Sequence, residues 1–182
     1  MAKLFVIIEG EHTSGDPNLR VGMGELLRKA LTKGSIKIKP LGGRSEAIKR
    51  FKKQRGPDIM LLLIDLDGPP SRRKSELQKE GLSTYSSDVF FMIQEMEAWF
   101  ISQSDILIDH WGEDLFQNFR NRNPQQIAKP SKDLERCTKG SKHGTYGKIS
   151  DGARLLKKLD PQKLKADFTD FKKLIKRIEA LS

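Results

Sequence analysis

The chain has 182 residues, of which 36% are hydrophobic and 32% charged, and its formal net charge is +10. This length suits one ordinary domain with a small appendage, and it is enough to bury a real hydrophobic core. The single cysteine, Cys137, excludes a disulfide framework and a cysteine-based zinc site. Because no apolar stretch has the length of a membrane span or a signal peptide, we expect a soluble, cytoplasmic protein without a membrane partner.

Apolar and amphipathic segments alternate along the first hundred residues, which predicts an α/β fold with a mostly parallel four-stranded sheet flanked by helices. The run 59–64 is apolar without a break, so we expect a central strand covered on both faces, whereas 35–41 alternates and lies nearer an edge. The expected strands are 4–8, 35–41, 59–64 and 88–94, and the expected helices are 21–31, 45–51, 71–82 and 95–102.

The last third of the chain has a different, basic character. Residues 129–182 hold fifteen Lys or Arg against seven Asp or Glu, so +8 of the net charge lies there. We therefore expect an α/β domain over 1–104 and a basic, mainly helical extension over 105–182 that packs on it. Within the extension, 133–146 reads as an exposed loop and 151–159 as a short helix. One longer helix begins at Asp160-Pro161, a typical N-cap and first position.

Acidic residues follow two of the predicted strands. Glu9 comes after the first strand, and Asp65 and Asp67 come at the end of the third. Open α/β sheets bind their ligands at the carboxyl ends of the strands, so neighbouring strands would bring the three acids together. Asp65 and Asp67 are two residues apart, which on a strand points both side chains the same way. Their mutual repulsion would be relieved by Mg²⁺, a cation that prefers carboxylates, waters and phosphates.

This combination resembles the Toprim fold, the catalytic domain of type IA and II topoisomerases, bacterial primases and overcoming-lysogenization-defect nucleases. The matching residues are Glu9-Gly10 and Asp65-Leu66-Asp67-Gly68, and the resemblance covers residues 3 to about 100. It implies a Toprim-like Rossmannoid fold with an Mg²⁺ (or Mn²⁺) site that makes or breaks phosphodiester bonds. Glu9, Asp65 and Asp67 would be the catalytic residues and metal ligands, with Glu9 as the acid/base.

A narrower resemblance covers most of the chain. Residues 93–100, Ile-Gln-Glu-Met-Glu-Ala-Trp-Phe, look like the Gln-x-x-Glu-Ala-Trp/Leu-Leu segment of the bacterial Toprim-like domain-of-unknown-function family 4276. The family's C-terminal half is similar to Tyr146-x-Lys148 and the residues that follow. The resemblance implies that Glu97 completes a second metal position or, alternatively, orients the next helix. A second acid typical of the family after Glu-Gly would be Glu11, Asp16 or absent. Members are often encoded beside ATPases in bacterial defence loci, which implies an ATPase partner.

The basic charge predicts a polyanionic partner, with DNA favoured over RNA. Lys142, Tyr146 and Lys148 lie in or next to the basic loop and are the candidates for contact with nucleic acid.

Three functions remain open from the sequence. The first is an Mg²⁺-dependent phosphoryl-transfer enzyme acting on nucleic acid, most simply a nuclease. The second is a non-catalytic Toprim-like subunit that binds an ATPase or nucleic acid, since fold does not fix activity. The third, a receiver-like phosphoacceptor at Asp65, ranks last because its acidic pair and lysine have no clear counterparts. Replacing Asp65 and Asp67 together by asparagine is expected to stabilise the metal-free protein if their repulsion dominates.

Overall fold

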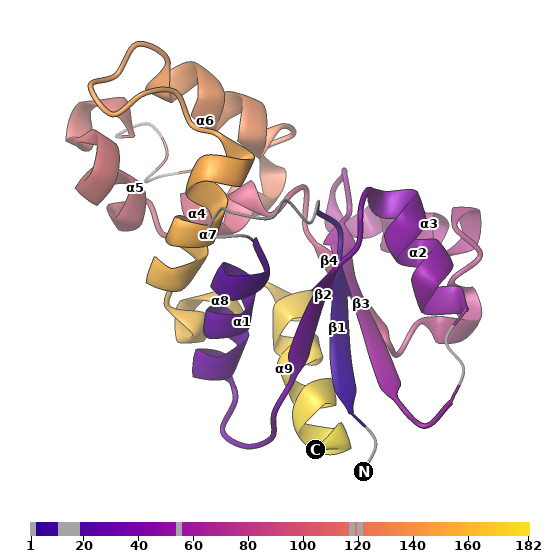
Figure 1. Cartoon of the computed structure of the whole chain (residues 1–182). Helices are drawn as coiled ribbons and strands as arrows, with labels where there is room; N and C mark the ends of the chain where they lie inside the picture. The colour runs from indigo at the N-terminus through magenta and orange to yellow at the C-terminus, as the bar shows by residue number, and fades with distance from the viewer. Residues whose placement is uncertain (1–2, 11–18, 54–55, 117–118, 120–121) are drawn as a thin grey trace.

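A four-stranded sheet forms the centre of the computed structural model, which describes residues 3–10, 19–53, 56–116, 119 and 122–182 (Figure 1). The strands run β2-β1-β3-β4 across the sheet, and each is parallel to its neighbours. Their bounds are Leu4–Ile8 for β1, Lys37–Pro40 for β2, Ile59–Asp65 for β3 and Val89–Met92 for β4. The α/β class, the four strands and the central place of β3 are therefore confirmed.

The two edge strands of the sheet are protected in different ways. β2 alternates exposed Lys37 with buried Ile38, as its sequence pattern predicts. β4 is apolar throughout, and side chains cover its outer edge. The Phe91 amide donates to Asp170 Oδ2 at 3.0 Å, and Arg73 Nη2 donates to the Val89 carbonyl at 3.0 Å. These bonds satisfy backbone groups that an open edge would otherwise offer to another chain.

Helices cover both faces of the sheet (Figure 1). α2 (Arg44–Lys52) and α3 (Arg73–Lys79) lie on one face, and α1 (Leu19–Ala30) and α9 (Thr169–Leu181) lie on the other. This distribution follows from right-handed crossovers, because the step from β1 to β2 and the step from β2 to β3 run in opposite directions along the sheet.

The C-terminal helices belong to the same hydrophobic core as the sheet. α7 packs along α1, α8 contacts α1 and α9, and α9 lies against β4. One cluster of buried apolar residues runs from β1 to α9, so the predicted boundary at residue 104 does not separate two cores. The remaining elements are α4 (Glu97–Ser102), α5 (Asp105–Trp111), α6 (Pro130–Thr138), α7 (Lys148–Lys158), α8 (Pro161–Asp167) and the 3-10 turns Pro70–Arg72, Ser83–Tyr85, Glu113–Leu115 and Pro124–Gln126.

Two expectations about the C-terminal part are wrong. The predicted exposed loop over 133–146 contains most of α6, which starts with Pro130 at its first position and buries Leu134 and Thr138 one turn apart. The predicted single helix after Asp160 is divided into α8 and α9, because Phe168 has extended backbone angles of −119° and 103°. The N-cap is confirmed, since Asp160 Oδ1 accepts from the Gln162 amide at 2.8 Å.

Two smaller differences concern helix lengths. α7 begins at Lys148, three residues before the predicted start, and α3 occupies only the middle of the predicted range 71–82. No helix among the described residues is long and apolar enough to cross a bilayer.

Candidate active site

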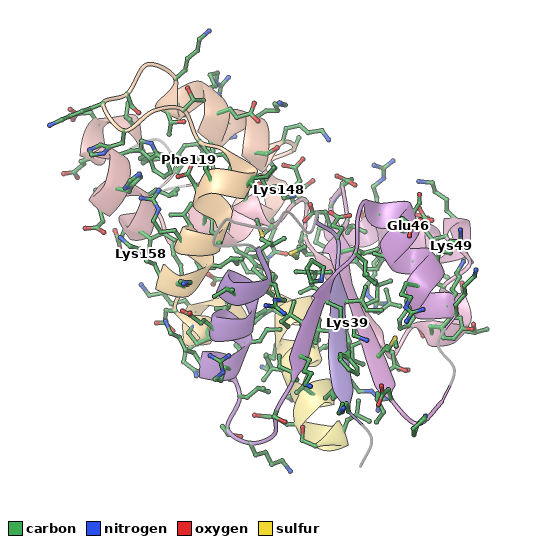
Figure 2. All side chains as sticks on the ribbon, viewed as in Figure 1. Lys39, Glu46, Lys49, Phe119, Lys148 and Lys158 are labelled. Atoms are coloured by element: carbon green, nitrogen blue, oxygen red, sulfur yellow. The ribbon has the colours of Figure 1, made fainter. Side chains whose placement is uncertain are left out.

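Acidic side chains meet at the carboxyl edge of the sheet, where β1, β3 and β4 end side by side. Glu9 follows β1, Asp65 is the last residue of β3, and Glu97 opens α4 shortly after β4. Glu9 and Asp65 share a hydrogen bond, so the predicted approach of the first and third strand ends is observed. Lys148, labelled in Figure 2, reaches the same place from the start of α7.

Asp65 is only 4% exposed and uses both carboxylate oxygens. Oδ1 accepts from the Met96 amide at 2.7 Å, and Oδ2 accepts from Lys148 Nζ at 2.9 Å. Charged hydrogen bonds of this kind are stronger than neutral ones. Asp65 therefore ties the end of β3 to α7 and to the segment just before α4.

Asp67 lies differently from the sequence expectation. β3 ends at Asp65, so the two-residue alternation of a strand does not extend to Asp67, whose φ of 55° is left-handed. Its side chain is 56% exposed and faces Arg44 Nη1 at 3.4 Å. Partial burial and then the charge of Asp65 raise the pKa of Asp67. Asp67 thus stands at the rim of the cluster rather than beside Asp65.

Glu97 is fully buried, and only one of its two carboxylate oxygens has a hydrogen-bond donor. Oε1 accepts from the Tyr146 hydroxyl at 2.8 Å, whereas Oε2 has no hydrogen-bond partner. Lys148 Nζ lies 3.9 Å from Oε2. Burial raises the pKa of Glu97, and the ammonium of Lys148 acts against that shift. A buried carboxylate oxygen without a donor is costly unless a cation, a water or a proton reaches it.

The position of Tyr146 differs from the exposed basic loop expected from the sequence. The side chain is 3% exposed and its hydroxyl points to Glu97, away from the surface. Burial and then the charge of Glu97 raise the pKa of the phenol. The hydroxyl therefore remains a donor that fixes the Glu97 carboxylate. By contrast, Lys142 is exposed, as its predicted role in nucleic-acid contact requires.

Replacing Tyr146 by phenylalanine is expected to lower the free energy of unfolding by about 1–3 kcal/mol, because Glu97 Oε1 would lose its donor inside the protein. Urea unfolding at pH 7 measures this change. Tyr85→Phe, at an exposed tyrosine on the surface, is the matched control and should change stability by less than about 0.5 kcal/mol. Equal stability of the two variants would show that the hydrogen bond from Tyr146 to Glu97 does not stabilise the folded protein.

Lys148 places an ammonium among the carboxylates. Burial opposes its charge, but Asp65 and then Glu97 outweigh this effect and raise the pKa of Lys148 above its ordinary value. The side chain is 43% exposed, so Lys148 is only partly covered by the rest of the protein. The Lys148 ammonium thus neutralises part of the negative charge of Asp65 and Glu97. The sequence alone did not predict this role.

Glu9 has the most perturbed carboxyl in the cluster. Burial, the charge of Asp65 and the hydrogen bond to Asp65 raise its pKa from 4.5 to about 8, although Lys148 and Arg44 act in the opposite direction. At neutral pH the folded protein therefore holds Glu9 mainly as the neutral acid.

Arg44, at the start of α2, supports the cluster from the other side. Nη1 donates to the Asp65 carbonyl at 2.5 Å, and Nη2 donates to Glu76 Oε1 at 2.7 Å. Glu80 adds a longer contact at 3.4 Å. Sequence reasoning missed Arg44. Its signal was its place directly after the Gly42-Gly43 turn that ends β2, which puts it at the same edge of the sheet as Glu9.

Glu95 is placed for a structural role. Oε2 accepts from the Ser131 amide at 2.9 Å, in the first turn of α6, and Lys129 Nζ lies 3.8 Å from Oε1. Glu95 therefore anchors α6 over the end of β4. Glu11 and Asp16, the two candidates for an additional acid, lie outside the described residues.

The carboxylates have the chemistry that a hard divalent cation prefers, but the described side chains are not gathered into a metal-binding group. All their ligand atoms are oxygens, burial raises the pKa of Glu9 and Glu97, and one Glu97 oxygen has no partner. In the described part of the chain, no three His, Cys, Asp or Glu side chains converge closely enough to form a metal-binding group. The ammonium of Lys148 stands between Asp65 and Glu97 at 2.9 and 3.9 Å, so these two carboxylates already share one cation.

The fold and the site define an α/β protein with a carboxylate cluster at the carboxyl edge of an all-parallel sheet. Residues 21–179 match the family model described as "Domain of unknown function (DUF4276)", and the chain belongs to this family. The match includes Asp65, Asp67, Glu97 and Lys148, and it begins after Glu9. No curated protein and no solved structure shows significant similarity to the chain.

Proposed function

We propose that this protein is a divalent-cation-dependent phosphoryl-transfer enzyme of Toprim type that cleaves nucleic acid. The observation that carries the proposal is that Asp65, at the end of the central strand, interacts with Glu9 and shares the Lys148 ammonium with Glu97. Two of these carboxyls have raised pKa values, and one oxygen of Glu97 is buried without a partner. Such perturbed groups in a cluster are typical of functional sites.

The carboxylates divide into two roles under this proposal. Asp65 and Glu97 would hold Mg²⁺ or Mn²⁺, with Asp67 at the rim as a further ligand. When bound, the cation would polarise the phosphodiester and lower the pKa of a nucleophilic water. Glu9 keeps its proton at neutral pH, so it can donate that proton to the leaving oxygen.

The positively charged groups have supporting roles. Arg44 holds the Asp65 carbonyl and faces Asp67, so it fixes the turn that carries both aspartates. Lys148 keeps Asp65 in place, and its partly exposed side chain would offer positive charge to a phosphate. Lys142 and the other basic side chains of the C-terminal third would add sequence-independent attraction to nucleic acid. An ATPase as a partner protein is part of the proposal through the family resemblance alone.

Purified protein incubated with supercoiled DNA, linear DNA and RNA tests the proposal. We expect cleavage in Mg²⁺ or Mn²⁺, none in EDTA, and a preference for DNA. Cleavage that continues in EDTA, or that separates from the protein on a sizing column, would contradict it.

A second candidate is a non-catalytic binding subunit of an ATPase or nucleic-acid complex. It is favoured by one observation: Lys148 already supplies a cation to Asp65 and Glu97. Salt-sensitive binding to DNA without cleavage, unchanged by added Mn²⁺, would select this candidate.

A further inference from the structure

A groove runs along the outer edge of the sheet, between α1 and the edge strand β2. It has a volume of about 530 Å³. Arg20 and Arg28 line it from α1, and Lys37 and Lys39 line it from β2. Ile38 faces Gly24 of α1 across the groove, whereas Lys39, labelled in Figure 2, points to the other face of the sheet, where its ammonium lies 3.7 Å from the centre of the Phe5 ring.

The positive charge of this groove is not cancelled within the described residues. Among the residues that the structure describes, Glu25 is the one acidic residue in its lining, and it pairs with Lys157 at 3.3 Å. No described carboxylate forms an ion pair with Arg28 or Lys37. A second basic groove, between α3 and α9, differs in this respect, because Asp170 and Asp88 neutralise its two arginines at 3.2 and 2.8 Å.

The groove leads to the acidic cluster. Its β2 wall ends at Pro40, which is in register with Ile8, and the Leu41 amide donates to the Ile8 carbonyl at 3.0 Å. Its α1 wall begins at Leu19, which contacts Gly10. Both walls therefore end beside Glu9, the residue between Ile8 and Gly10.

The dimensions of the groove fit a short stretch of one strand. Arg20 and Arg28 are two helical turns apart, about 12 Å along α1, and Lys37 and Lys39 are about 7 Å apart along β2. Proteins that bind single strands combine cations along the backbone with apolar surface for the bases. Arg20 and Arg28 on α1, the lysines along the edge strand, and the apolar lining residues Val21 and Ile38 provide the same combination.

We propose that this groove binds a single strand of nucleic acid through its phosphates and guides it to Glu9. The proposal rests on the proposed function, since it names the path by which the substrate reaches the acidic cluster. Lysines on an edge strand also discourage pairing between sheets. A binding measurement is therefore needed to separate this role from phosphate contact.

The test measures binding of a fluorescent 20-mer of single-stranded DNA in EDTA, so no cleavage can occur. Arg28→Gln with Lys37→Gln removes two charges from the groove. The matched control, Lys173→Gln with Lys176→Gln, removes two charges from the groove between α3 and α9. We expect binding to weaken about tenfold in the first variant at 100 mM salt, with the salt slope reduced by about 1.4, and less than about twofold in the control.

Equal weakening in both variants would overturn the proposal, because it would show a general effect of net charge. A 20-bp duplex that binds as tightly as the single strand, and loses as much in the groove variant, would overturn the single-strand assignment. Cleavage measured separately in Mg²⁺ distinguishes the two proposals. If binding depends on the groove but no cleavage occurs, only the proposed nuclease activity is contradicted. If cleavage occurs but binding does not depend on the groove, only the proposed role of the groove is contradicted.

Discussion

Asp65→Asn is expected to reduce nucleic-acid cleavage by about 10³-fold and to weaken Mn²⁺ binding by at least about tenfold. Asp65 occupies the centre of the cluster, between Glu9 and Lys148, and no other described carboxylate contacts both. The substitution keeps the shape of the side chain and an oxygen for the Met96 amide, but it removes the negative charge. A cation would then have only Glu97 and the more distant Asp67 as charged ligands.

The same variant is expected to be less stable than the wild type in metal-free buffer, by about 1–3 kcal/mol. Loss of the charge leaves the Lys148 ammonium without its closest partner. Here the structure changes the expectation from sequence, which assumed that the two aspartates mainly repel each other. Asp67 lies at the exposed rim beside Arg44, so we expect the lost ion pair between Asp65 and Lys148 to outweigh the relieved repulsion between the two aspartates.

Urea unfolding, Mn²⁺ titration and a cleavage assay measure these effects on one preparation. Asp114→Asn, at an exposed aspartate in the turn after α5, is the control for a change of one charge. If the Asp65→Asn protein cleaves at the wild-type rate, the acidic cluster takes no part in catalysis. One that is more stable without metal would show that repulsion outweighs the pair with Lys148.

Glu9→Gln is expected to remove a pH dependence of stability worth about 4 kcal/mol between pH 4.5 and 8. The pKa of Glu9 is about 8 in the folded protein, against 4.5 for an ordinary glutamate. Between these values the folded state keeps a proton that the unfolded state releases. The wild-type free energy of unfolding therefore falls as pH rises through this window.

The glutamine variant has no proton to lose at this position, and it keeps a neutral group of the same shape. We expect the two proteins to be similarly stable near pH 4.5 and the variant to be the more stable one at pH 8. Denaturant unfolding across this range checks the difference. The control Glu46→Gln, at an exposed residue of α2, should show the same change of the free energy of unfolding with pH as the wild type. If Glu9→Gln also shows the same pH dependence of the free energy of unfolding as the wild type, the pKa of Glu9 is not raised by folding.

The sequence predicted the part of the site that depends on strand order. Unbroken apolar runs identify β1 and β3 as central strands, and the chain direction of a parallel sheet places Glu9 and Asp65 at one edge. These two inferences use only periodicity and the rule that parallel strands end together. Glu97 was a candidate through the resemblance of residues 93–100 to the family's Gln-x-x-Glu-Ala-Trp/Leu-Leu segment.

The rest of the site depends on tertiary contacts that periodicity does not encode. Lys148 reaches Asp65 from a residue 83 positions later, and Tyr146 reaches Glu97 from 49 positions later. The backbone of Asp67 turns to a left-handed conformation directly after the strand, so its side chain leaves the expected face. The composition of 133–146 suggested a loop, but burial of Leu134 and Thr138 makes its first part a helix.

We propose that the acidic cluster binds a divalent cation, and anomalous scattering from crystals grown with Mn²⁺ tests this proposal most directly. We expect a manganese peak in contact with Asp65 and Glu97, with Lys148 Nζ farther from Asp65 than the 2.9 Å of the present structure. Crystals saturated with Mn²⁺ that show no peak at this edge of the sheet, with Lys148 still bound to Asp65, would contradict the claim.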